Sequence, residues 1–126
     1  MPISYDTPAA PAAIGPYSQA VRTGNLLFLS GQIPIVPGSG EIEAPDISGQ
    51  SEQVMRNIGA ILEAAGLGFE DVVKTSCFLT DIADFAAFNT VYARYFTGKP
   101  ARSCFAVAAL PKNARVEVEV IAQIKK

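Results

Sequence analysis

The chain of 126 residues contains neither histidine nor tryptophan. Without an imidazole it cannot form a Ser-His-Asp triad, a Cys-His dyad or an HExxH zinc site. Only two cysteines are present, Cys77 and Cys104, and they form no CxxC pair. Two separated thiols exclude a four-thiolate metal site and argue against a disulfide framework. Acid–base chemistry in this chain therefore depends on Asp, Glu, Lys, Tyr, Cys or ordered water.

The sequence also shows no targeting or membrane-spanning segment. The N-terminus has no basic stretch followed by an apolar run, and no segment reaches the ~18 apolar residues of a spanning helix. Free thiols without an export signal are typical of a reducing compartment. We therefore expect a cytoplasmic protein that binds no membrane.

Positive charge is scarce, since ten Lys and Arg side chains are set against twelve Asp and Glu. The net charge of −2 argues against nucleic-acid binding, which requires many phosphate-neutralising cations. Residues 99–126 nevertheless carry six basic and two acidic side chains, whereas residues 1–98 carry four basic and ten acidic ones. This basic end is compatible with attracting a small anion, and also with a chance distribution of surface charge.

Apolar residues, by contrast, make up 49% of the chain, enough for the core of one domain spanning residues 1–126. Their spacing predicts an α+β protein with the order β-β-α-β-α-β-β. The expected strands lie within residues 19–23, 25–30, 71–79, 101–110 and 115–124. The expected helices run from Asp46 or Ser48 to Gly66, and over about 82–96. Residues 7–16 are expected to be an extended lead-in, and residues 34–46 a loop.

Right-handed crossovers place both helices on one face of the predicted sheet. Strand alternation puts Arg102 and Cys104 on the same side of their strand, and Glu117 and Glu119 on the same side of theirs. We expect all four on the face that the helices leave open. Because a monomer would expose this mixed apolar and charged face, a symmetric oligomer is predicted.

Two charged residues are the main candidates for chemistry. Arg102 offers a planar guanidinium that suits a carboxylate, although a surface or interface salt bridge is the alternative. Glu117 lies on a valine-rich strand, where half-burial raises the pKa of a carboxyl and lets it transfer protons. Its alternative is a solvated strand face.

Two further residues are weaker candidates. Cys104 lies two residues from Arg102, whose charge would lower the pKa of the thiol, and the alternative is a small packing residue. Tyr17 follows Ile14-Gly15-Pro16 and would cover a pocket with its ring and hydroxyl. Its alternative is simple packing of the N-terminal arm.

The expected strand directions separate the two charged candidates. Arg102 and Glu117 each begin a strand, so in antiparallel strands they lie roughly 20 Å apart within one chain. No small substrate spans that distance. If both residues act on one molecule, they come from neighbouring subunits, and the site lies between chains.

A set of motifs then points to a known family. They are AAIGPYSQAV at 12–21, LSGQIP at 29–34, GLGFEDVVKTSCFLTDIADF at 66–85, NTVYARYF at 89–96, PARSC at 100–104 and LPKNARVEVEVIA at 110–122. Together, and in this order, they resemble the RidA (reactive intermediate deaminase A) family, also called the YjgF or L-PSP family. The resemblance covers nearly the whole chain.

The resemblance implies a chorismate-mutase-like (YjgF-type) fold, with a mixed sheet and two helices packed on one face. It also implies a homotrimer with three sites between subunits. The implied activity is that of a 2-iminobutanoate/2-iminopropanoate deaminase. Such an enzyme hydrolyses enamines and imines such as 2-aminoacrylate and 2-aminocrotonate to 2-keto acids and ammonia, with no cofactor or metal.

The family's site residues map onto matching positions of this chain. By this resemblance Arg102 clamps the substrate carboxylate, and Glu117 positions or activates water. Cys104 contributes mainly its backbone, while Tyr17 and Ser30 line the pocket. One departure is the short connection before Pro100, where only Gly98 and Lys99 follow Thr97 and many relatives have several more residues. Substrate preference is the property that this shortening affects.

Two other functions are compatible with the family resemblance. A protein that binds small carboxylates or keto acids without turnover would also use Arg102, but it gains nothing from the nearby anion Glu117. An endoribonuclease or translation inhibitor is disfavoured by the negative net charge and by the lack of histidine.

Overall fold

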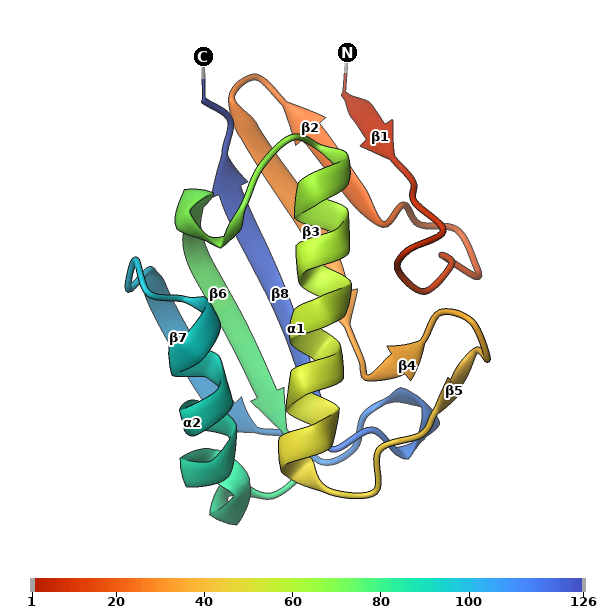
Figure 1. Cartoon of the computed structure of the whole chain (residues 1–126), viewed down its shortest axis with the longest axis vertical. Helices are drawn as coiled ribbons and strands as arrows, with labels where there is room; N and C mark the ends of the chain where they lie inside the picture. The colour runs from red at the N-terminus through yellow and green to blue at the C-terminus, as the bar shows by residue number, and fades with distance from the viewer. Residues whose placement is uncertain (1, 126) are drawn as a thin grey trace.

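Six strands form one mixed sheet, and helices α1 and α2 lie on the same face of it (Figure 1). The computed structural model describes residues 2–125. The strand order is β1-β2-β3-β8-β6-β7, in which only the β6–β7 pair is parallel. The strands are β1 (Ile3–Tyr5), β2 (Ala20–Thr23), β3 (Leu26–Gln32), β6 (Val72–Leu79), β7 (Ala101–Ala106) and β8 (Val116–Gln123). The α+β class and the predicted succession of elements are thereby confirmed.

Helix α1 (Ile47–Ala64) has the predicted ends. The Asp46 side chain accepts a hydrogen bond from the Gly49 N–H at 2.8 Å, as an N-cap does. Gly66 follows the helix with φ of +76°, a left-handed conformation that glycine adopts without strain. Helix α2 (Phe85–Tyr95) is preceded by a 3₁₀ turn at Ile82–Asp84. Within residues 2–125, no helix is long and apolar enough to cross a membrane.

Three short strands were not predicted. Strand β1 pairs with β2 and forms one edge of the sheet. Strands β4 (Ile35–Val36) and β5 (Glu41–Ile42) form a hairpin inside the segment expected to be a loop. Strands of two or three residues are too short for alternation to reveal them, and the prolines of residues 34–46 mask the pattern further.

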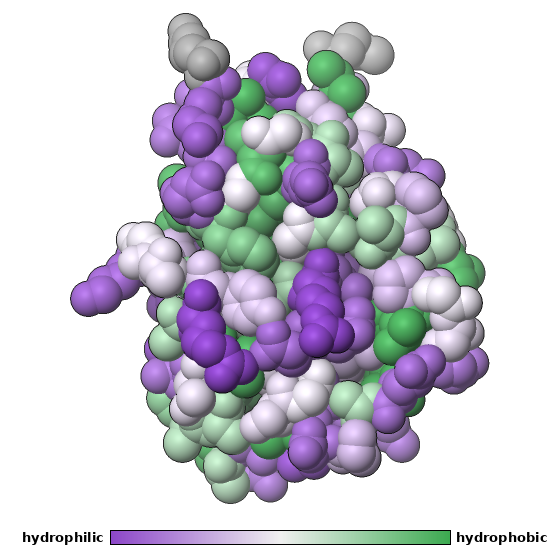
Figure 2. Space-filling model, in the orientation of Figure 1, coloured by the Kyte–Doolittle hydropathy of each residue, from purple (hydrophilic) through white to green (hydrophobic). Residues whose placement is uncertain are grey.

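The hydrophobic core fills the space between the two helices and the sheet. On the helix side, Leu27 and Leu29 of β3 and the valines of β8 are almost completely buried. Phe88, Tyr92 and Phe96 at the α2 end of the core are buried as well, which confirms that the aromatic stripe is mainly core. The outer surface of this side carries many hydrophilic side chains (Figure 2).

The register of β7 overturns one prediction. Arg102 pairs with Thr75 and Cys104 pairs with Cys77, and both partners are fully buried on the helix side. Arg102 and Cys104 therefore face α2, not the open face, so the prediction that they share a face with Glu117 was wrong. Alternation shows which residues of a strand share a side, but β7 carries apolar residues on both sides and so does not reveal which side meets the helices.

The open face of the sheet combines aromatic and charged residues. Glu117 is aligned with Phe78, which is aligned in turn with Phe105 on β7. The Phe78 and Phe105 rings contact each other edge to face, with centroids 5.3 Å apart. Phe105 is 48% exposed and Phe28 on β3 is 41% exposed. This apolar surface agrees with the expectation that a single chain leaves this face uncovered.

Candidate active site

A cavity of about 320 Å³ lies beside Glu117, where three irregular segments meet. These segments are the N-terminal lead-in, the end of β3 and the turn that precedes β8. The pairing of β3 with β8 is irregular between Leu29 and Gln32, so Ser30 and Gly31 lie outside the regular register. The cavity is lined by Pro11, Ala12, Tyr17, Gln19, Ser30, Gly31, Gln32, Ile33, Ile35, Pro111 and Glu117.

The Glu117 side chain is the carboxylate of this cavity. Burial raises the pKa of Glu117 above its usual value, and the negative charge of Glu119 raises it further. A Cβ at Gly31 would overlap Glu117 Oε2 and lie 2.9 Å from Cδ, so a side chain there would force the carboxylate to move. The arrangement provides a half-buried carboxyl suited to holding and transferring a proton.

The two predicted lining residues, Tyr17 and Ser30, are both found at this cavity. The Ser30 hydroxyl donates to the Ser18 carbonyl at 2.6 Å, and the Ser30 N–H donates to the Gln19 carbonyl at 2.9 Å. Ser30 thus ties the lead-in to β3. Tyr17 is 54% exposed, which leaves its ring at the mouth of the cavity.

Arg102 lies in a separate groove of about 390 Å³ between α2 and the start of β7. Its Nη1 donates to Asn89 Oδ1 at 2.7 Å. The guanidinium carbon lies 4.6 Å from the centroid of the Tyr92 ring and 5.4 Å from that of Phe85. One face of α2 therefore orients the guanidinium through an amide and two aromatic rings. Its other N–H donors remain for a carboxylate.

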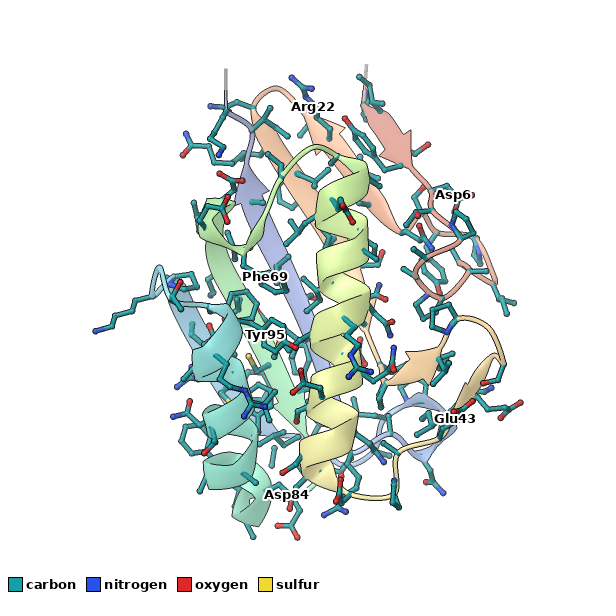
Figure 3. The ribbon with its side chains drawn as sticks, viewed as in Figure 1. Asp6, Arg22, Glu43, Phe69, Asp84 and Tyr95 are labelled. Carbon is teal, nitrogen blue, oxygen red and sulfur yellow. The ribbon has the colours of Figure 1, made fainter. Side chains whose placement is uncertain are left out.

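Helix α2 is itself held firmly against the rest of the molecule. Phe69 and Tyr95 meet between the helices, with ring centroids 5.2 Å apart (Figure 3). At the other end of α2, Asp84 accepts hydrogen bonds from Arg115 Nη2 at 3.1 Å. These contacts fix the position from which α2 orients Arg102.

Cys104 faces the core next to Cys77. Burial raises the pKa of the Cys104 thiol and outweighs the opposing effect of the Arg102 charge. Burial raises the pKa of Cys77 to about 12. Both side chains are thiols at neutral pH, which favours the packing interpretation of Cys104 over a thiolate role. Among residues 2–125, no three His, Cys, Asp or Glu side chains come together as a metal site.

Within one chain, Arg102 and Glu117 are not brought together. Glu117 and Phe105 are both aligned with Phe78 on β6. Arg102 therefore lies about 10 Å from Glu117 along the strand direction and about 10 Å from it across two strand spacings. This separation is shorter than the roughly 20 Å expected from the sequence, because β6 lies between the two strands and sets a different register. The two residues also lie on opposite faces of the sheet, and their cavities share no lining residue.

Sequence reasoning missed several residues of these cavities. Gly31 was visible in the SGQ motif, but the carboxylate against its Cα comes from a strand far along the chain. Asn89 lies in the quoted NTVYARYF segment, and only the fold places it on the guanidinium of Arg102. The isoleucines at 33 and 35 resemble ordinary core residues and carry no separate signal.

The fold and these cavities define a small α+β protein of a known family. Residues 7–124 match the family described as Endoribonuclease L-PSP. The 2-iminobutanoate/2-iminopropanoate deaminase of Escherichia coli is 50% identical over 120 residues, covering 92% of this chain and 93% of that protein. The structure of E. coli TdcF with bound serine matches with a TM-score of 0.92 at 44% identity, covering 98% of this chain and 99% of that one.

A plant relative is similar over the same region. Reactive Intermediate Deaminase A, chloroplastic, from Arabidopsis thaliana is 49% identical over 119 residues. The match covers 94% of this chain but only 64% of that protein. The chain thus belongs to the L-PSP family, which is the RidA/YjgF family that its motifs predict. Imine deaminases are found among its members.

Proposed function

We propose that this chain is a cofactor-independent deaminase that hydrolyses 2-imino acids and their enamine tautomers to 2-keto acids and ammonia. The observations that carry the proposal are a half-buried carboxyl with a raised pKa, Glu117, and a pre-oriented guanidinium, Arg102, each at its own cavity. A carboxylate clamp alone would serve simple binding. A nearby second anion with a raised pKa serves proton transfer instead.

The proposed site combines residues of two subunits in a homotrimer. The Glu117 cavity of one subunit would meet the Arg102 groove of its neighbour. Support comes from the position of the two residues on opposite faces of one sheet, and from the exposed Phe28 and Phe105 on the open face. Exposed apolar surface of this kind favours association with another copy.

In the proposed mechanism, Arg102 binds the substrate carboxylate and orients the imine carbon. Glu117 orders a water molecule and takes a proton from it as the oxygen bonds to that carbon. The resulting carbinolamine receives this proton on nitrogen. The carbinolamine hydroxyl then gives its proton to Glu117, which passes it to the amino nitrogen as the C–N bond breaks. Ammonia and the keto acid are released, and Glu117 is again a carboxylate. Tyr17 and Ser30 line the cavity, and Cys104 contributes backbone.

A coupled assay tests this proposal. A serine or threonine dehydratase generates the enamine, and keto-acid formation is followed with wild type and with Arg102→Ala. We expect acceleration by wild type only, with kcat/KM reduced ~30-fold or more in the variant, because a charge-assisted hydrogen bond contributes about 2 kcal/mol. Arg22→Ala at the β2–β3 turn is the matched control (Figure 3).

Two outcomes would contradict the proposal. Equal activity of Arg102→Ala and wild type would remove Arg102 from the site. No acceleration by wild type, combined with measurable binding of 2-oxobutanoate, would favour a carboxylate-binding protein. Although the family description names an endoribonuclease, the net charge of −2 and the absence of histidine do not favour RNA cleavage by this chain.

A further inference from the structure

Two walls of the Glu117 cavity are irregular backbone whose carbonyls are held by buried side-chain amides. The first wall is the segment 30–35, which runs from the irregular end of β3 to the start of β4. Asn57 on α1 is 1% exposed, and its Nδ2 donates to the carbonyls of Ile33 at 3.1 Å and Ile35 at 2.9 Å. Its Oδ1 accepts from Gln53 Nε2 at 2.9 Å, which fixes the orientation of the amide.

The second wall is the N-terminal lead-in, and Gln19 holds it in the same way. Gln19 is 2% exposed. Its Oε1 accepts from the Thr7 N–H at 2.7 Å, while Nε2 donates to the carbonyls of Thr7 at 3.1 Å and Pro11 at 2.8 Å. A longer contact of 3.4 Å joins Nε2 to the carbonyl of Ala10. The Gln19 amide thus binds residues at both ends of the segment 7–11 and holds the proline-rich lead-in in a turn.

The lead-in and Ile33 lie outside the strands, and Ile35 pairs only with Ile42 of the β4–β5 hairpin, so buried amides supply donors to their carbonyls. A buried carbonyl without a donor costs about 1–3 kcal/mol, so each segment adopts the path that reaches its amide. Three of the held residues line the cavity: Ile33 and Ile35 on one side, and Pro11 on the other. The segment 30–35 also contains Gly31, which packs directly against the Glu117 carboxylate.

We propose that Asn57 and Gln19 are positioning residues, which hold the two cavity walls in the geometry that places Glu117 for proton transfer. This inference rests on the proposed function, since it treats the Glu117 cavity as part of the active site. Neither residue acts on the substrate. Asn57 acts through backbone that it fixes from the protein interior, and Gln19, which also lines the cavity, acts through the lead-in that it holds.

Isosteric substitutions test the proposal. Asn57→Asp and Gln19→Glu keep the side-chain shape but place a carboxylate oxygen where an amide NH2 group donates to backbone carbonyls. The control is Gln50→Glu, which makes the same change at another buried amide. Gln50 is 5% exposed, donates to Ala44 at 3.1 Å and accepts from the Arg115 N–H at 2.9 Å, and neither partner lines the cavity.

The test measures kcat, KM and the midpoint of unfolding for each variant, with activity expressed per folded molecule. The expected result is a tenfold or larger fall in kcat for Asn57→Asp and Gln19→Glu, and little change for Gln50→Glu at a comparable loss of stability. The ratio of Asn57→Asp to wild-type activity should also rise on acidification, because the protonated carboxyl regains one O–H donor.

Equal activity per folded molecule in all three variants would overturn the proposal and leave these amides a purely structural role. If Asn57→Asp does not fold, Asn57→Ser replaces it, since its hydroxyl can donate only one hydrogen bond. Calorimetry with 2-oxobutanoate gives a readout that needs no turnover. Wild type that binds this keto acid without catalysis contradicts the proposed function alone, whereas unaltered kcat together with unaltered binding in the folded Asn57 and Gln19 variants contradicts the positioning role.

Discussion

The contact between Gly31 and Glu117 shows how single residues create the site. The carboxylate of Glu117 packs against the Cα of Gly31, where any side chain would collide with it. The same burial that makes this contact tight raises the pKa of Glu117. Two residues far apart in the sequence thus jointly determine where the carboxyl lies and how firmly it holds its proton.

Gly31→Ala should therefore impair activity more than stability. The added Cβ overlaps Oε2 and forces the carboxylate away, so we expect kcat/KM to fall at least tenfold. Steady-state kinetics and thermal unfolding measure the two effects. Gly38→Ala is the control, because a Cβ there meets no atom within 4 Å. Similar kinetics for both variants would show that the carboxylate tolerates displacement.

Glu117 should also make stability depend on pH. A carboxyl whose pKa is higher in the folded state favours folding below its unfolded pKa, and this contribution is lost as the pH rises through the folded pKa. We expect Glu117→Gln to be more stable than wild type at pH 7, with the difference vanishing near pH ~4. Chemical unfolding across this range measures the effect. A constant difference at all pH values would contradict it.

At the scale of elements, both helices position parts of the candidate site. Helix α2 orients Arg102 through Asn89 and Tyr92, and α1 reaches the cavity wall through Asn57. The Tyr92 hydroxyl also shares a buried hydrogen bond of 2.8 Å with Thr75 on β6. Tyr92 therefore combines two roles, one in stability and one in orienting the guanidinium.

Two substitutions at Tyr92 should separate these roles. Tyr92→Phe removes the buried hydrogen bond but keeps the ring, so we expect a loss of about 1–2 kcal/mol in stability with little change in KM. Tyr92→Leu also removes the cation–π contact, worth about 0.5–2 kcal/mol, so KM should rise several-fold. Denaturant unfolding and steady-state kinetics measure both quantities. Equal KM values for the two variants would argue against the guanidinium role.

At the scale of the whole molecule, the sheet is a partition between the two charged residues of the proposed site. Arg102 lies on the helix side at one edge, whereas Glu117 lies on the open side. The open side exposes Phe28 and Phe105. This geometry favours a site completed by a neighbouring subunit over one contained in a single chain.

Mixing two inactive variants tests this shared site. Arg102→Ala retains Glu117 and Glu117→Ala retains Arg102, so a mixed form of the proposed trimer would contain an intact pair at some interfaces. After complete exchange of equal amounts, we expect about one quarter of wild-type activity, the chance that a given interface receives both residues. Subunit exchange is verified by mass spectrometry of differently labelled chains. No recovery despite exchange would contradict a shared site.

The sequence by itself determined the elements and the family. The amphipathic spacing of α1, the Asp46 cap, Gly66 and the alternating valines of β8 are local signals, because helix and strand periodicities depend on near neighbours. The motifs around Tyr17, Ser30, Arg102 and Glu117 identified the family for the same reason. They are contiguous stretches of chain.

Only the tertiary structure decided how these residues meet. Alternation placed Arg102 and Cys104 together but not on the correct side, because the pairing of β7 with β6 sets the face. The close approach of Gly31 to Glu117, the guanidinium on Tyr92 and the amide of Asn57 on the cavity wall all join distant segments. Such contacts depend on strand order and register, which hydrophobic patterning leaves open.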